Sequence, residues 1–458
     1  MSLARLAARL ADGELSPREA VALSLETIER LDPLLNAFIS VRAEEALAEA
    51  VGLERAQGRG PLWGVPVAVK DVIDVAGTAT TAASRILAGR LADRDAHVVE
   101  RLRAAGAVVV GKLNLHEFAY GALTTSPHFG PARNPWDPER VCGGSSGGNG
   151  SAAAAGLAAG TLGTDTAGSI RIPAAFCGVT GVRPTTGRVS NRGVVPVAWT
   201  FDAVGPLART AEDCALLLEA IAGRDPEDPS TADVPVPRYG SELGEGVQGL
   251  RVGLVKALLE RDVDSAVAAA VEAGVRELGA LGARVEPVEL PLFEEAGVIQ
   301  QAMQFPEATA AHLPWLRTRL ADYGADVRTR LLVGLFVPPT VYVTGQRARR
   351  LLFERWRPVL ERFDLLAAPT MPVLPPRLGE ETVLVDGREV AYRLALIRFN
   401  SCWSLPGLPV VSVPCGFVDG LPVGLALVGR RFGEATVLRA AHAFQQATDW
   451  HERRPAVV

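Results

Sequence analysis

The sequence predicts an α/β protein with three layers, α/β/α, in which helices cover both faces of a large mixed central β-sheet. Short apolar segments without alternation, such as GVPVAVKD (64–71), are typical of strands that are buried on both faces. Such segments follow stretches of helical periodicity, as where HVVERLRAAG (97–106) precedes AVVVGK (107–112). This succession indicates layers of helices packed around one sheet.

The first 60 residues are predicted to form a helical N-terminal region. Leu3, Leu6 and Leu10 recur at helical spacing. Ser16 followed by Pro17 is typical of a helix start, because a serine caps the free N–H groups and proline fits the first helical position.

Two later segments interrupt the succession of helices and strands. Residues 223–240 are rich in proline and acidic residues and are predicted to be a surface connection. Residues 291–357 are predicted to be a mainly helical insertion near the substrate cleft, within a single domain of residues 1–458. Further strands are predicted at 250–256, 283–290, 364–370, 408–416 and 423–429, and further helices at 263–282 and 434–447.

Composition excludes several classes of function. The 458 residues are 48% hydrophobic and 22% charged, and their formal net charge is -5. Because the sequence contains no basic patch that could bind a phosphate backbone, no nucleic acid is expected as a partner. No run of 18 uncharged apolar residues and no signal peptide are found, which predicts a cytoplasmic protein without a membrane partner. The five cysteines are odd in number and lack zinc-site spacing, so we expect free thiols, no metal and no cofactor.

The most unusual segment is 142–178, which is dense in glycine, serine and alanine. A flexible linker is disfavoured because an alanine-rich, helix-like piece follows within the segment. A phosphate-binding loop would need a lysine after the glycines, and none follows. Residues 144–148 match G-x-S-x-G, but that motif requires a catalytic histidine. The later histidines, His312, His442 and His451, lie in segments typical of ordinary helix or tail.

An ordered set of motifs resembles the amidase-signature family. The set includes GVPVAVKD (64–71), GGSSGG (143–148), GTDTAGSIR (163–171), FDAVGPLART (201–210) and LPGLPVVSVPCG (405–416). The resemblance implies a serine amidohydrolase in which Ser169 is the nucleophile and Lys70 is the base. It also implies that Ser145, preceded by a cis peptide bond, relays the proton between them.

The chemistry of these residues agrees with that implication. A serine hydroxyl is a poor nucleophile until a base takes its proton. Lysine acts as a base only when neutral, so its ordinary pKa of ~10.4 must fall by roughly 2 to 3 pH units. Lys70 ends an apolar run, where burial would disfavour the charged amine and lower the pKa.

The oxyanion of the acyl-transfer intermediate needs hydrogen-bond donors. The resemblance assigns this role to the backbone N–H groups of Thr166, Ala167, Gly168 and Ser169. Relatives usually carry glycine where Ala167 stands, and the methyl group is expected to narrow the acyl pocket without removing an N–H.

Other residues are assigned by the same resemblance. Asp165 and Arg171 match the family pattern and are expected to support the catalytic loop, a role that a structural ion pair would also fill. Tyr120, Thr124 and Trp199 fall in segments that line the substrate cleft in relatives, although each residue type is equally suited to the core.

The resemblance implies an amidase that hydrolyses the C–N bond of a small linear carboxylic amide, with that amide as its small-molecule partner. A homodimer is common in such proteins. The alternative is the A subunit of a glutamyl-tRNA amidotransferase, which releases ammonia from glutamine. Against that alternative, relatives carry an acidic residue where this chain has Ile397-Arg398-Phe399-Asn400, and residues 291–357 lack a tyrosine-rich helix.

Overall fold

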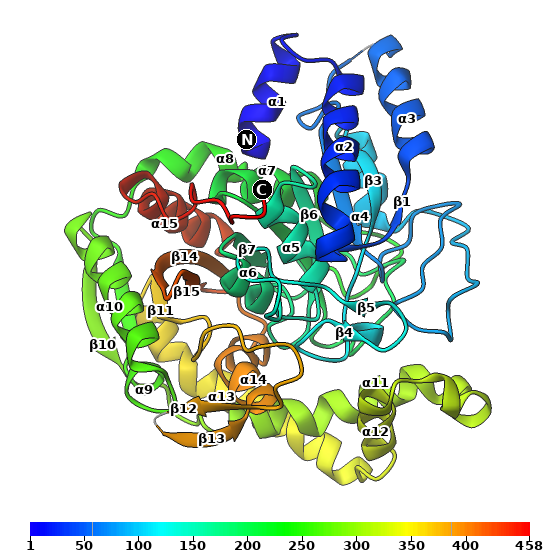
Figure 1. Ribbon diagram of the computed structural model, residues 1–458. Coiled ribbons are helices and arrows are strands. Elements are labelled where there is room, and N and C mark those ends of the chain that lie inside the picture. Colours follow the sequence, from blue (N-terminus) through cyan, green and yellow to red (C-terminus); the bar gives the residue numbers. More distant parts are fainter. Residues whose placement is uncertain (57, 386) are drawn as a thin grey trace.

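A mixed sheet of eleven strands forms the centre of the molecule in a computed structural model that describes residues 1–56, 58–385 and 387–458 (Figure 1). Residue 57, which falls in the N-terminal region predicted to be helical, lies outside the described residues. The order of the strands is β1-β3-β2-β6-β8-β7-β14-β15-β11-β9-β10. Neighbours run parallel in β2–β3, β2–β6 and β9–β10 and antiparallel in β6–β8 and β14–β15. The predicted fold class is confirmed.

The strands of the sheet are short except for the long hairpin near the C-terminus. They are β1 (Phe38–Val41), β2 (Pro66–Lys70), β3 (Val108–Leu113), β6 (Gly160–Asp165), β7 (Thr180–Arg183), β8 (Ala203–Ala208), β9 (Arg251–Val255), β10 (Arg284–Val288), β11 (Leu365–Pro369), β14 (Val410–Val418) and β15 (Leu421–Gly429). Two small hairpins lie outside the sheet: β4 (Thr125–Ser126) with β5 (Gly130–Pro131), and β12 (Thr382–Val385) with β13 (Arg388–Ala391).

Helices cover both faces of the sheet. Successive strand residues point to opposite faces. On β8, Leu207 packs with residues of α5 and α6, whereas Ala208 packs in the cluster that contains α7. The helices are α1 (Leu3–Ala11), α2 (Pro17–Leu35), α3 (Ala43–Arg55), α4 (His97–Ala104), α5 (Gly147–Ala155), α6 (Arg171–Cys177), α7 (Ala211–Ile221), α8 (Tyr239–Glu242), α9 (Ala257–Glu260), α10 (Ser265–Ala280), α11 (Ala296–Thr318), α12 (Ala325–Gly334), α13 (Pro339–Arg362), α14 (Tyr392–Ser404) and α15 (Glu434–Ala447).

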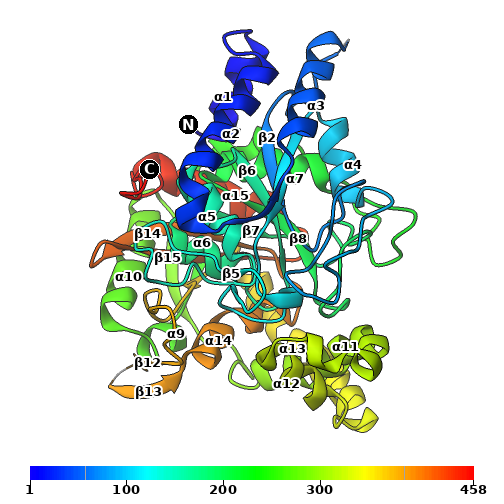
Figure 2. The same cartoon turned by 45° about the vertical axis from the view of Figure 1, so that its right-hand side comes forward.

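The first helices and the helical insertion lie at opposite ends of the molecule. Figures 1 and 2 both place α1–α3 at one end and α11–α13 at the other. Ser16 caps α2 in a capping box with Glu19, which explains why this helix begins where the sequence predicts. In the part of the chain that the structure describes, no helix is both long and apolar enough to cross a membrane.

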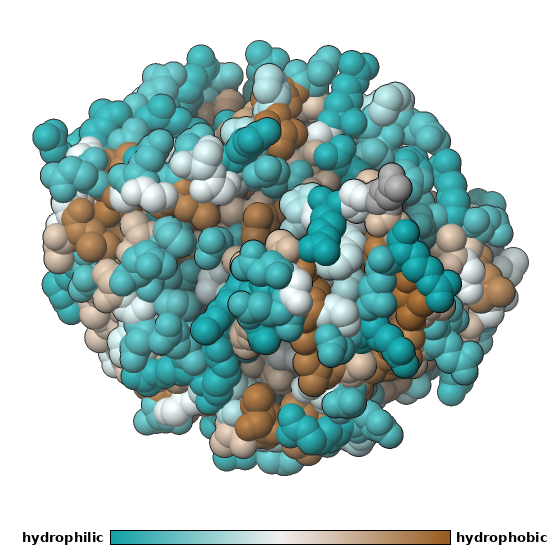
Figure 3. All heavy atoms as spheres, turned by 90° about the horizontal axis from the view of Figure 1, so that it is seen from above, coloured by the Kyte–Doolittle hydropathy of each residue, from teal (hydrophilic) through white to brown (hydrophobic). Residues whose placement is uncertain are grey.

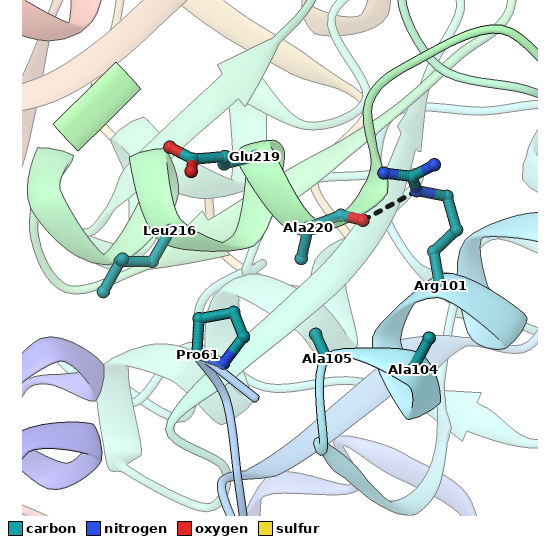
Figure 4. Close-up of a pocket in the computed structure, with 7 residues that line it drawn as sticks. All are labelled: Pro61, Arg101, Ala104, Ala105, Leu216, Glu219 and Ala220. Atoms are coloured by element: carbon teal, nitrogen blue, oxygen red, sulfur yellow. Dashed lines mark hydrogen bonds between the residues drawn. The ribbon is translucent and has the colours of Figure 1, made fainter. Parts of the chain in front are cut away.

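The surface is mixed in character. In Figure 3, hydrophobic residues are scattered among hydrophilic ones over the face that is seen from above. One surface hollow lies between α4 and α7, where Arg101 Nε donates to the Ala220 carbonyl at 2.8 Å (Figure 4). This hollow shares no residue with the site described next.

Candidate active site

Two adjacent parallel strands bring the key segments of the sequence together. The last residue of β2 is Lys70 and the last of β6 is Asp165, and the two strands pair in parallel. Their carboxyl ends therefore lie at the same edge of the sheet. Ser169 follows β6 in the turn before α6, and Ser145 lies just before α5.

Lys70 is fully buried and surrounded by hydroxyl groups. Its Nζ donates to Ser145 Oγ at 2.7 Å, to Ser146 Oγ at 2.9 Å and to Thr164 Oγ1 at 2.9 Å. Burial lowers the pKa of Lys70 to about 7, although Asp165 and Asp202 act in the opposite direction. The protonated amine donates all three bonds, whereas the neutral amine that forms near this pKa has two N–H groups and accepts the third bond from a hydroxyl.

Backbone contacts fix the loop that carries Ser145. The Gly144–Ser145 peptide bond is cis, as the resemblance implies. Thr124 braces the loop, since its hydroxyl donates to the Gly143 carbonyl at 2.8 Å and accepts from the Gly147 N–H at 3.0 Å. The Ser146 N–H donates to the Ser169 carbonyl at 3.1 Å, which ties this loop to the loop that carries Ser169.

A buried carboxylate organises the loop of Ser169. Asp165 accepts from the Gly168 N–H at 2.9 Å and from the Ile170 N–H at 3.1 Å. Arg171 binds the same carboxylate through two bonds of 2.9 and 2.8 Å, and Arg183 lies 3.2 Å from it. Burial alone would raise the pKa of Asp165, but the two guanidinium groups and the Gly168 N–H hold it well below its usual range. Asp165 and Arg171 thus hold the turn before α6 through direct contacts.

The predicted oxyanion donors differ in availability. The Gly168 N–H donates to Asp165 and so is engaged in holding the loop, in contrast to its predicted role. Within the described part of the chain, the N–H groups of Thr166, Ala167 and Ser169 have no acceptor. Thr166, Ala167 and Ser169 all line one pocket. These three N–H groups therefore remain available as donors to an oxyanion in this pocket.

The pocket beside Ser169 is narrow and carries two cations. Arg330 and Arg393 line it together with Tyr120, and the Arg330 guanidinium lies 5.0 Å from the centre of the Tyr120 ring. Burial, assisted by Arg393, lowers the pKa of Arg330 to about 10. The remaining lining residues are Ala119, Gly121, Ala122, Thr166, Ala167, Ser169, Ile172, Gln304 and Ile397.

The three predicted cleft residues occupy different places. Tyr120 lines the pocket. Thr124 is buried behind the Ser145 loop, which it braces, and does not line the pocket. Trp199 is 49% exposed and lines a separate hollow that also contains Asp202 and Asp228.

Sequence reasoning predicted a helical insertion near the cleft but missed the individual residues that line the pocket. Arg330 on α12 and Gln304 on α11 reach the pocket, and Arg393 comes from α14. Asp326 pairs with Arg330 and also lies 3.0 Å from His116 Nε2. The buried Arg330 sits within a helical pattern, ADVRTRLLVG, that is indistinguishable from an exposed charged helix, so the sequence carried no local signal for it.

The described residues form neither a metal site nor a site with a histidine base. They contain no group of three or more His, Cys, Asp or Glu side chains that could hold a metal ion. His312, one of the three histidines considered for the G-x-S-x-G alternative, packs against the Phe118 ring and contacts Tyr323 Oη at 2.9 Å.

The fold and this site define an amidohydrolase. The sequence profile of the Amidase family matches residues 19–438, and the chain belongs to that family. The A subunit of the glutamyl-tRNA(Gln) amidotransferase of Moorella thermoacetica is 42% identical over 96% of this chain and 95% of its own length. The solved structure of the corresponding protein from Thermotoga maritima is 39% identical, with a TM-score of 0.81 over 94% of this chain and 92% of that one. A structure reported for a vestigial protein complex, linked to the origins of an s-triazine catabolic enzyme, is 37% identical with a TM-score of 0.94, covering 98% of both chains.

These relatives correct one expectation from the sequence. The exclusion of nucleic acid and the restriction to a small-molecule partner are wrong, because several full-length relatives at 40–42% identity are named as subunits of a tRNA amidotransferase. The physical reason is that the absence of a basic patch describes only the chain's own surface. One component of an assembly is not required to contact the phosphate backbone itself.

Proposed function

We propose that this chain is the ammonia-releasing A subunit of a glutamyl-tRNA(Gln) amidotransferase, which hydrolyses the side-chain amide of glutamine through an acyl-enzyme on Ser169. The observation that carries the chemistry is the buried contact between Lys70 and Ser145, because it supplies a neutral base at physiological pH. The full-length identity to subunits of that name supports the biological role.

In the first half of the reaction, Ser169 Oγ attacks the amide carbonyl. Its proton passes to Ser145 Oγ, while the Ser145 proton passes to Lys70 Nζ. The carbonyl oxygen becomes an oxyanion that accepts from the N–H groups of Ala167 and Ser169, and each such donor is typically worth ~10²–10³ in rate. Lys70 then returns the proton through Ser145 to the leaving nitrogen, and ammonia departs.

In the second half, water attacks the acyl-enzyme along the same route. Lys70, neutral again, accepts the proton of the water through Ser145. The tetrahedral intermediate collapses, Ser169 regains its proton, and the free acid leaves. Each step uses the same relay in one direction and then in the other, so a single buried lysine serves as base and as acid.

The charges of the acyl pocket support glutamine as the substrate. Arg330 is partly balanced by Asp326, whereas no carboxylate within the described residues pairs with Arg393, whose buried Nε has no partner there. Arg393 as a whole is only partly buried, but a buried polar atom such as its Nε is ordinarily hydrogen-bonded. The α-carboxylate of glutamine would supply the anion that this pocket is missing.

A second candidate is favoured by one specific feature of the same pocket. None of the lining residues is acidic, and Ile397 occupies a position at its wall. The α-ammonium group of glutamine would therefore meet no carboxylate in the pocket. An amidase for a carboxamide that has a carboxylate but no amino group, such as glutaramate, fits this wall better.

The deciding experiment combines labelling with a substrate series. A fluorophosphonate should give one adduct, on Ser169, by mass spectrometry, and Ser169→Ala should abolish both the adduct and ammonia release. Ser241→Ala, at an exposed site, is the control. Ammonia release is then compared for glutamine, glutaramate and pentanamide.

Preference for glutamine, together with glutamine-dependent amidation of glutamyl-tRNA(Gln) when the other amidotransferase subunits are added, would support the main proposal. Preference for glutaramate without that amidation would support the second candidate. Turnover that persists in Ser169→Ala would contradict both.

A further inference from the structure

The peptide between Thr166 and Ala167 is held by a side chain of the insertion. Gln300, on α11, is buried, and its Nε2 donates to the Thr166 carbonyl at 2.9 Å. In a trans peptide the C=O and the following N–H point in opposite directions. A donor that fixes the Thr166 carbonyl on one side therefore directs the Ala167 N–H to the other, and Ala167 lines the pocket of Ser169.

The side chain of Thr166 is held from a second direction. Its Oγ1 donates to Asp202 Oδ1 at 2.5 Å. The other carboxylate oxygen of Asp202 accepts from the N–H groups of Val197 and Ala198 at 2.8 and 3.0 Å. The backbone of its own loop therefore fixes the carboxylate, and the carboxylate in turn restrains the Thr166 side chain.

We propose that Gln300 and Asp202 are positioning residues of the oxyanion hole, which clamp Thr166 so that the Ala167 N–H faces the developing oxyanion. The proposal rests on the proposed amide hydrolysis at Ser169. Neither side chain lines the pocket, so both act through the Thr166–Ala167 peptide. The clamp joins three parts of the chain: the turn after β6, the loop before β8 and the insertion helix α11.

Asp202 also has an electrostatic effect on Lys70. Burial raises the pKa of Asp202 to about 6, against the Thr166, Val197 and Ala198 donors, and Glu307 acts in the same direction as burial. Asp202 and Asp165 are the carboxylates that raise the pKa of Lys70 against its burial. Loss of the Asp202 charge would therefore move the titration of Lys70 to lower pH, which a purely structural role would not do.

The test uses Gln300→Met, which keeps the length of the side chain but removes the donor. We expect kcat for ammonia release to fall by about tenfold to a hundredfold with KM changed less than about threefold, which is less than the ~10²–10³ lost with a whole donor. Affinity for butylboronic acid, whose tetrahedral adduct on Ser169 places an oxygen in the hole, should fall by a similar factor. Thr309→Val is the matched control, because it removes a buried bond of the same helix to the Leu331 carbonyl, away from Thr166.

A second variant keeps the proposal testable if Gln300→Met does not fold. Asp202→Asn should lower kcat and also shift the acidic limb of the kcat/KM profile to lower pH. Unchanged kcat and boronate affinity in either folded variant, or an equal loss in Thr309→Val, would overturn the proposal. Absence of any Ser169 adduct in the unaltered protein would instead contradict the proposed function, so the two failures are distinguishable.

Discussion

Lys70 Nζ lies 2.7 Å from Ser145 Oγ, and both residues are 0% exposed. Two opposing effects set the charge of this lysine. Burial disfavours the ammonium ion, whereas the nearby carboxylates of Asp165 and Asp202 favour it, and burial prevails. The site thus contains an amine whose pKa is lowered to about 7, next to a hydroxyl that would pass its proton on in the proposed mechanism.

The first prediction concerns the pH dependence of catalysis. Because the base must be neutral and the pKa of Lys70 is lowered to about 7, kcat/KM should fall about tenfold for each pH unit below that value and level off above it. Lys70→Arg should be inactive at every pH, because a guanidinium does not lose its proton in proteins. A profile that stays flat down to pH 5, measured by ammonia release, would remove Lys70 as the base.

The second prediction concerns Arg393. Arg393→Gln removes the pocket cation that has no paired carboxylate among the described residues. We expect kcat/KM for glutamine or glutaramate to fall by about tenfold to a hundredfold, as for loss of a hydrogen bond to a charged group. The rate for pentanamide should remain the same, because that neutral amide has no carboxylate that could bind Arg393. Equal losses for the charged and neutral amides would show that Arg393 does not bind a carboxylate.

The scaffold of the site was predictable, because its elements have strong local patterns. The apolar run before Lys70 predicts β2, and Ser16 with Pro17 predicts the start of α2, as the structure shows. The strand β6, GTLGTD, was missed, since its glycines and small polar residues lack the β-branched bulk typical of strands. A side chain at Gly160 or Gly163 would nevertheless be crowded, because a Cβ would lie 2.6 Å from Leu217 Cδ1 and 2.9 Å from Ser146 Oγ, respectively.

The pocket was the least predictable part. Arg330 and Arg393 come from helices that are far from Ser169 in the sequence and carry no motif of their own. Their role depends on how α12 and α14 pack, which local periodicity does not reveal. Conversely, Trp199 falls in a segment that predicts a cleft residue, but it lines a different hollow of the surface.

The third prediction concerns the stability of the catalytic loop. Asp165→Asn leaves Arg171 and Arg183 buried without their carboxylate, so the free energy of unfolding in urea should fall by about 3–5 kcal/mol. Because the pKa of Asp165 is lowered in the folded state, its contribution is present above the ordinary pKa of ~3.9 and is lost as pH falls below it. The variant and the parent should therefore converge in stability in strong acid. A difference of less than about 1 kcal/mol at pH 7 would show that this ion-pair cluster does not hold the loop.

The last prediction compares two neighbours in that loop. Gly168 has a φ of +120°, and a Cβ there would lie 2.6 Å from the Asn400 Cβ, so Gly168→Ala must displace the loop. We expect ammonia release to fall by at least about a hundredfold, since misplacing a reacting group by ~1 Å costs that much. Ala167→Gly removes only a methyl group from the pocket wall and keeps the N–H, so glutamine turnover should stay within about threefold of the parent. Because the wider pocket admits larger acyl groups, activity toward a branched carboxamide such as 3-methylglutaramate should rise relative to glutaramate. If Gly168→Ala remains active, the loop geometry around Ser169 is not what sets the rate.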